Sequence, residues 1–202
     1  MTQQLAASAK SHAWLLPATM ASVAIAGSLG MGTMGAMTAS ISNEQNTAGA
    51  GKLVMQEAGG KDPGSTTCTS SDGDNNAATC SNVNQYGGNL QMAPGLTETT
   101  PLKFTNVGTV TATSFTLTAG QCQSEPVAAD MCAHINVTIM DGTKQVYQGS
   151  AAALSNQSFT LAAPVKPGEG RPFTVAVELS KDVPNSAQGG SINQPLTWTF
   201  TA

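Results

Sequence analysis

The sequence is poor in charged residues, in histidine and in aromatic side chains. Charged residues make up 10% of its 202 residues, against about 25% in an average soluble domain, and the formal net charge is −4. A nucleic-acid-binding surface needs clustered cations, so this charge excludes nucleic acid as a partner. The chain has two histidines, His12 and His134, which is too few for most metal or acid–base sites built on imidazole.

Motifs of known catalytic chemistry are also missing. The sequence contains no Gly-x-Ser-x-Gly, Walker-type or His-Glu-x-x-His motif, and its carboxylates are scattered. Residues 72–76, Asp-Gly-Asp-Asn-Asn, are rich in oxygen ligands but lack the register of an EF-hand loop. The pattern favours a solvated loop, with calcium binding as the alternative. We therefore predict a protein that is not an enzyme and has no cofactor, catalytic residue or metal ligand.

The first 39 residues have the layout of a signal peptide. Lys10 precedes a charge-free run over residues 14–35, and small residues follow this run. This order matches a positively charged region, an apolar region and a site for signal peptidase. We predict a helical signal peptide over residues 1–39 that is cleaved between Ala39 and Ser40, so that the mature chain is secreted. A retained N-terminal anchor is the alternative, which the weak apolarity of the run disfavours.

Four cysteines in an exported chain indicate two disulfides. Of the three possible connectivities we choose the sequence-local one, which pairs Cys68 with Cys80 and Cys122 with Cys132. Neither pair has the Cys-x-x-Cys spacing of redox or zinc sites. A structural role is therefore the favoured interpretation of all four cysteines.

Apolar residues recur with a period of two after residue 39, which predicts half-buried β-strands. The clearest inward-facing sets are Phe173, Val175, Val177 and Leu179; Ile135, Val137 and Ile139; and Leu196, Trp198 and Phe200. His134 is expected on the polar face of the second of these strands. Asp141-Gly142 has the sequence of a tight hairpin turn after that strand.

Seven or eight strands separated by turns predict an all-β fold, a β-sandwich of the jelly-roll type, over residues 40–202. Residues 149–156 contain the only compact group of helix formers. Residues 59–88 are dominated by Gly, Ser, Thr, Asn and Asp. We expect them to form a long surface insertion in an otherwise single domain.

Three separate stretches of the sequence contain short motifs that are informative when taken together. Residues 36–44 and 47–55 place a small-residue junction before a Gly-x-Leu strand, and residues 90–95 and 102–109 read Leu-…-Pro-Gly and Phe-x-Asn-x-Gly-Thr. Residues 182–190 and 196–202 place an Asn-x-x-Gln-Gly loop before a closing strand. Together they resemble the TasA/camelysin family of exported bacterial and archaeal proteins. The cysteine pairs and the 59–88 insertion depart from that family's pattern.

The resemblance implies a subunit of an extracellular biofilm-matrix fibre, released at the cell surface by signal peptidase. Such subunits form head-to-tail homopolymers by donor-strand exchange, in which the freed N-terminus of one copy adds as a strand to the next. Here the donor would be residues 40–48, beginning Ser40, Ile41, Ser42, Asn43 and Glu44. Two alternatives remain: a monomeric cell-surface adhesin with cell-wall or matrix contacts, and a camelysin-like metalloprotease.

Overall fold

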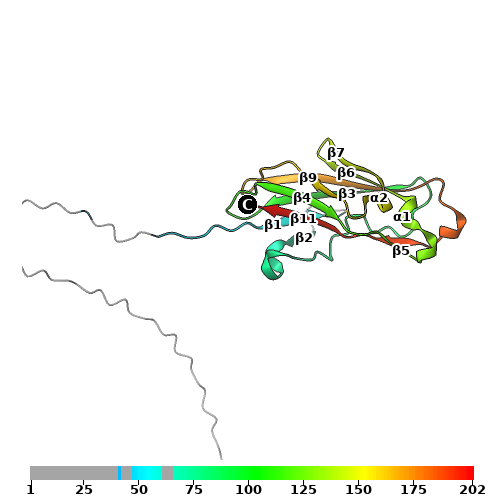
Figure 1. The fold of residues 1–202 in the computed structure, drawn as a ribbon, viewed down its shortest axis with the longest axis horizontal. Helices are drawn as coiled ribbons and strands as arrows, with labels where there is room; N and C mark the ends of the chain where they lie inside the picture. Colours follow the sequence, from blue (N-terminus) through cyan, green and yellow to red (C-terminus); the bar gives the residue numbers. More distant parts are fainter. Residues whose placement is uncertain (1–40, 42–46, 61–65) are drawn as a thin grey trace, which may run out of the picture. The chain divides into compact units, whose positions relative to one another are not determined.

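The computed structural model describes residues 41, 47–60 and 66–202. Its compact body spans Thr47–Ala202 (Figure 1). The predicted signal peptide, its cleavage site and the donor residues other than Ile41 and residues 47–48 lie outside the described residues. Within the described part of the chain, no helix is long and apolar enough to cross a membrane.

Strands dominate the body. In chain order they are β1 Met55–Gly59, β2 Thr66–Thr69, β3 Thr97–Asn106, β4 Ser114–Ala119, β5 Gln123–Glu125, β6 Ile135–Asp141, β7 Lys144–Ser150, β8 Ser158–Thr160, β9 Gly170–Leu179, β10 Ser191–Asn193 and β11 Leu196–Thr201. The helical turns are η1 Ser70–Asp72, η2 Asp74–Asn76, η3 Val127–Ala129, α1 Met131–His134, α2 Ala151–Leu154 and η4 Asn185–Ala187.

The strands form an antiparallel β-sandwich, which confirms the all-β prediction. One layer is a six-stranded sheet in the order β2-β1-β3-β9-β6-β7. The other layer contains the three-stranded sheet β11-β4-β8 and the pair β10-β5 (Figure 1). The β10-β5 pair continues the β11-β4 ladder after a one-residue offset, since Asn193 faces Gln123 whereas Leu196 faces Ala119. Residues 191–201 therefore form one long edge of the second layer.

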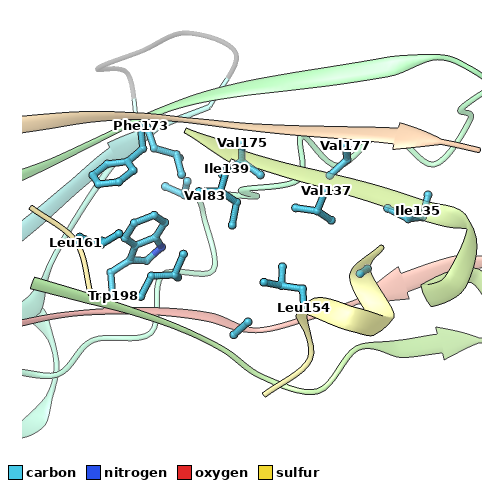
Figure 2. Close-up of a cluster of buried hydrophobic side chains, with 14 of the residues drawn as sticks. Val83, Ile135, Val137, Ile139, Leu154, Leu161, Phe173, Val175, Val177 and Trp198 are labelled. Carbon is cyan, nitrogen blue, oxygen red and sulfur yellow. The ribbon is translucent and has the colours of Figure 1, made fainter. Parts of the chain in front are cut away.

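The predicted alternation of side chains builds the core. Val137 and Val177 face each other across β6 and β9, as do Ile139 and Val175, and all four are buried. Figure 2 shows these side chains pointing from the six-stranded sheet into the space between the layers. Burying each such side chain contributes about 1.5–3 kcal/mol, so the neighbouring strands β6 and β9 supply much of the driving force for folding.

Five aromatic residues, Phe104, Phe115, Phe173, Trp198 and Phe200, meet in one cluster that joins the two layers. Phe104 on β3 stacks on Trp198 on β11 with ring centroids 4.3 Å apart. Phe115 on β4 meets Phe173 on β9 edge to face at 5.6 Å. Paired aromatic rings contribute about 0.5–1.5 kcal/mol beyond the area that they bury. This cluster fixes β11 above the β3 side of the six-stranded sheet.

Two sequence-based expectations need correction. The 59–88 segment is not only a surface insertion, because Thr66–Thr69 pair with β1 as strand β2 and the side chain of Val83 is buried in the core. His134 is not on a strand face. It ends the short helix α1, because Asp130 adopts a left-handed conformation that starts the helical turn and the strand begins one residue later.

Candidate interaction site

Four strands lie at the edges of the two main sheets, and three of them are poor templates for another strand. β2 has four residues and β8 has three. β7 is longer, but it carries Lys144, and its ladder with β6 shifts register at Met140. Charges, short length and bulges are the devices by which proteins protect sheet edges from pairing with other chains.

The fourth edge strand, β11, has none of these protections. Its sequence is Leu-Thr-Trp-Thr-Phe-Thr, without charge or proline, and its ladder with β4 runs in unbroken register. Trp198 is buried, whereas Thr197 and Thr199 on the opposite face are exposed. In the described residues, the backbone partners of β11 belong to β4 and its neighbour Thr113. Every second N–H and C=O along an edge strand points away from its partner, so β11 is able to accept a further strand.

A large groove lies beside this edge. It has a volume of about 960 Å³ and separates β1, which contributes Met55 and Glu57, from β11, which contributes Trp198 and Phe200. Residues 81–92, here called the strap, run between these two rims, and most of them line the groove. The groove is therefore the gap between the two layers on the β1/β11 flank, with the strap lying across it.

Side-chain hydrogen bonds hold the strap to both layers. Gln85 donates from Nε2 to Glu57 Oε1 at 2.7 Å, and its Oε1 accepts from Trp198 Nε1 at 3.0 Å. The Tyr86 hydroxyl donates to Gln194 Oε1 at 2.8 Å. Gln194 is itself buried and donates to the carbonyl oxygens of Gly120 and Ala151. The strap thus bridges β1 in one layer and the β10–β11 edge in the other.

Glu57 is a carboxylate on the inward face of β1, opposite Phe104, and only 7% of its surface is exposed. Burial raises the pKa of Glu57 from its ordinary value, and the hydrogen bond from Gln85 offsets part of this increase. Burial also raises the pKa of the Tyr86 phenol, so this hydroxyl stays protonated and serves as a donor to Gln194.

The chain that precedes β1 leaves the body at the end where the C-terminus lies. The carbonyl of Lys52 accepts hydrogen bonds from the backbone N–H groups of Thr109 and Val110, just after β3. A Cβ on Gly108 would collide with the backbone of Lys52, so this close approach needs glycine. Thr113, on the same connection, bonds the Thr201 carbonyl at the end of β11. Residues 47–51 therefore lie at the same end of the body as the C-terminus (Figure 1).

Both predicted disulfides are present. Cys68 on β2 joins Cys80, with Cα atoms 5.8 Å apart, and Cys122 joins Cys132 on α1, with Cα atoms 6.0 Å apart. The first bridge ties the beginning of the strap region to the six-stranded sheet. Two such bridges indicate an oxidising environment for the folded protein.

The other residues that the sequence singles out have structural roles. Asp72 Oδ2 caps the backbone of Thr69, and Asn76 donates to the carbonyl of Leu53, so the 72–76 loop is folded around its own polar groups. No group of three or more His, Cys, Asp or Glu side chains that could hold a metal occurs in the part of the chain that the structure describes. Asn106, from the Phe-x-Asn-x-Gly motif, is buried and donates to the carbonyls of Val110 and Val165.

Sequence reasoning missed the polar residues of the groove: Glu57, Gln85, Tyr86 and Gln194. They belong to no motif and come from distant parts of the chain. Comparison with known protein families finds no family model that matches the sequence, and comparison with curated proteins finds no match.

Proposed function

We propose that this protein is an exported structural subunit of an extracellular fibre. In this proposal residues 40–48 of one copy add as a strand to β11 of the next copy. The observation that carries the proposal is the edge strand β11, which has no charge, proline or bulge and lies beside a large groove. Strand addition of this kind obtains affinity from backbone hydrogen bonds and specificity from alternate side chains.

The dimensions of donor and acceptor agree. A nine-residue extended segment spans about 30 Å at about 3.3 Å per residue. On the same basis β11 alone spans about 20 Å, and the edge extended through Pro195 and β10 spans about 36 Å. Ile41 in the donor segment is 95% exposed, so it has an apolar side chain to bury in the groove. The donor contains no proline, so each of its residues is able to contribute an N–H group.

The position of the chain exit supports an open assembly. The chain before β1 leaves the body at one end of the sandwich. A donor segment that continues from this end would therefore reach a neighbouring copy placed beyond it. A contact between two different surfaces of identical subunits produces a filament when its rotation does not close a ring. A head-to-tail homopolymer is the assembly that follows from this arrangement.

Deletion of residues 40–48 tests the proposal most directly. The secreted protein should begin at or near Ser40, which intact-mass measurement checks. The deletion variant should remain a folded monomer by size-exclusion chromatography and circular dichroism, whereas the parent forms fibres in negative-stain microscopy. Polymerisation of the deletion variant would contradict donation by this segment.

A matched pair at Ile41 separates the backbone contribution from the side-chain contribution. Ile41→Pro and Ile41→Ala both remove the apolar side chain, but only proline also removes the N–H donor. Ile41→Pro should therefore impair fibre formation more strongly than Ile41→Ala. Equal effects would mean that residue 41 contributes through its side chain alone.

A monomeric cell-surface binding protein is the second candidate, because the groove also has the size of a ligand site. Ligand pockets in proteins occupy about 300–1,000 Å³ and combine apolar walls with a few polar groups. Trp198, Tyr86 and Gln194 provide this combination here. A parent protein that stays monomeric under every condition tried would favour this candidate, with a cell-wall or matrix polymer as the ligand.

We propose a structural rather than a catalytic role. His134, which supplies the only imidazole after residue 39, sits at the end of α1. Purified protein should show no metal-dependent proteolysis. Turnover that is lost in the His134→Ala variant would overturn this assignment.

A further inference from the structure

We propose that the strap is a built-in occupant of the receiving groove, and that it must leave when residues 40–48 of a second copy add to β11. This inference rests on the proposed function and concerns how that same site is regulated. It assigns a role to the part of the 59–88 insertion that reaches into the core, together with the residues that follow it.

The first step concerns how the strap is held. Among the described residues, its backbone makes no hydrogen bond to the backbone of β1 or of residues 191–201. Its ties to the two rims are the side-chain bonds of Gln85 and Tyr86 and the buried side chain of Val83. Two longer side-chain bonds join it to the rest of the six-stranded sheet: Asn82 donates to the Thr67 carbonyl at 3.3 Å, and Asn89 donates to Glu98 at 3.5 Å. An added strand, in contrast, would form a continuous backbone ladder with β11. The strap therefore occupies the gap between the layers but, in the described residues, gives the outward N–H and C=O groups of β11 no backbone partner.

The second step concerns space. A strand added to β11 would lie about 4.8 Å from it, in the opening between β11 and β1. Gln85 occupies this opening, because its side chain contacts Trp198 on one side and Glu57 on the other. Donor and strap therefore compete for one position, and the donor enters only after the strap contacts break.

The third step concerns how the strap is able to move without unfolding the sheets. Its N-terminal side is tethered by the Cys68–Cys80 disulfide, and its C-terminal side by the Gly95 N–H, which donates to the Leu179 carbonyl at 2.7 Å. Between these tethers the strap contains no strand or helix, and Leu90 is 81% exposed. Release of Val83, Gln85 and Tyr86, together with the bonds of Asn82 and Asn89, would open the groove and leave both tethers in place.

A disulfide that locks the strap tests the proposal. A Cβ built on Gly59 lies 3.1 Å from Cγ1 of Val83, close to the spacing between a Cβ and the partner sulfur in a disulfide, and Leu102 Cδ2 is the side-chain atom that must shift. The Gly59→Cys/Val83→Cys variant should fold as a monomer, and peptide mapping should show the new bridge beside the two native ones. Its rate of fibre formation should fall at least tenfold. Gly59→Ala/Val83→Ala, which changes the same positions without a cross-link, should assemble at least as fast as the parent.

A second pair of variants weakens the attachment of the strap instead of locking it. Tyr86→Phe removes the strap's bond to Gln194, and Tyr147→Phe removes a similar hydroxyl bond to the Ser150 carbonyl, outside the groove. Tyr86→Phe should increase the assembly rate about fivefold, as expected for the loss of one hydrogen bond, whereas Tyr147→Phe should leave the rate unchanged. Hydroxyl-radical footprinting should show that the side chain of Tyr86, half-buried in the monomer, becomes more exposed in the fibre.

The possible failures are distinguishable. If the locked protein assembles at the parent's rate, or if the Tyr86 side chain is no more exposed in the fibre than in the monomer, the strap is not released and the inference is wrong, while the proposed function stands. If the parent and the Tyr86→Phe variant neither assemble nor bind a synthetic peptide of residues 40–48, the groove does not receive this segment. The inference and the proposed function then fail together. A monomer that buries its own N-terminal segment against β11 would also overturn the inference.

Discussion

The two flanks of the sandwich are closed in different ways. On the β7/β8 flank the chain passes directly between the layers through α2, whose Ala151 and Leu154 are fully buried (Figure 2). The following residues join the sheet by backbone bonds, since the Ala119 N–H donates to the Gln157 carbonyl. The ring of Tyr147 also lies 5.8 Å from that of Phe159. On the β1/β11 flank the strap closes the gap mainly through polar side chains.

This difference indicates that one flank is permanent and the other is exchangeable. Opening the β7/β8 flank would expose the buried apolar surface of α2 to water and would break backbone hydrogen bonds. Both changes would destabilise the native fold. Opening the strap flank would break a small number of side-chain hydrogen bonds and would expose Val83, which is buried, together with Tyr86 and Met92, which pack against the core in part. A site for strand addition belongs on the flank that opens more easily.

The largest expected effect comes from truncating one apolar residue on each flank. Leu154→Ala should lower the free energy of unfolding by about 2–5 kcal/mol, because the residue is fully buried and leaves a closed cavity. Val83→Ala should cost only about 1–2 kcal/mol, because it removes fewer carbons and borders a groove that solvent enters. Urea denaturation of both variants measures the difference. Equal losses would mean that the strap belongs to the permanent core.

An intermediate effect is expected from adding a charge to each long edge strand. Thr199 on β11 and Gln148 on β7 are both exposed, so Thr199→Lys and Gln148→Lys change the net charge equally and should leave the fold intact. A lysine on an edge strand opposes pairing with another strand. Thr199→Lys should therefore reduce fibre formation at least tenfold, whereas Gln148→Lys should have little effect. The reverse result, measured by light scattering and microscopy, would move the receiving edge to β7.

The core of the fold could be predicted from the sequence because its signals are local. Phe173, Val175 and Val177 alternate with smaller or polar residues, and the hairpin turn at Gly142 follows the Ile135–Asp141 strand. A period of two gives each strand an inward face, and the Asp-Gly pair marks the turn. Burial in the structure follows these patterns closely.

The strap flank could not be predicted in this way because its contacts are long-range and polar. Trp198 and Gln85 are 113 residues apart, and neither belongs to a periodic pattern that points to the other. Val83 stands between Asn82 and Asn84 in a segment rich in Gly, Ser and Asn, which has the composition of a loop. Glu57 follows Met55 at the spacing of an inward face, but a carboxylate is usually assigned to solvent. The candidate site emerges only when the two layers are assembled.

The smallest expected effect concerns Glu57, the charged member of the strap flank. Because burial raises its pKa above the ordinary value of 4.5, the native state keeps this proton at a pH where the unfolded chain has already released it. The contribution of Glu57 to stability therefore falls as the pH rises from about 4.5 through the raised native pKa, and it is constant above that pKa. Glu57→Gln keeps an oxygen acceptor for Gln85 but cannot ionise. Below pH 4.5 the parent and variant should have similar stability, and towards neutral pH the variant should become the more stable of the two. Urea denaturation of both proteins at a series of pH values measures this difference. A difference that does not change with pH would show that the Glu57 carboxylate is solvated in the groove, and the strap would then close its flank less tightly than its hydrogen bonds indicate.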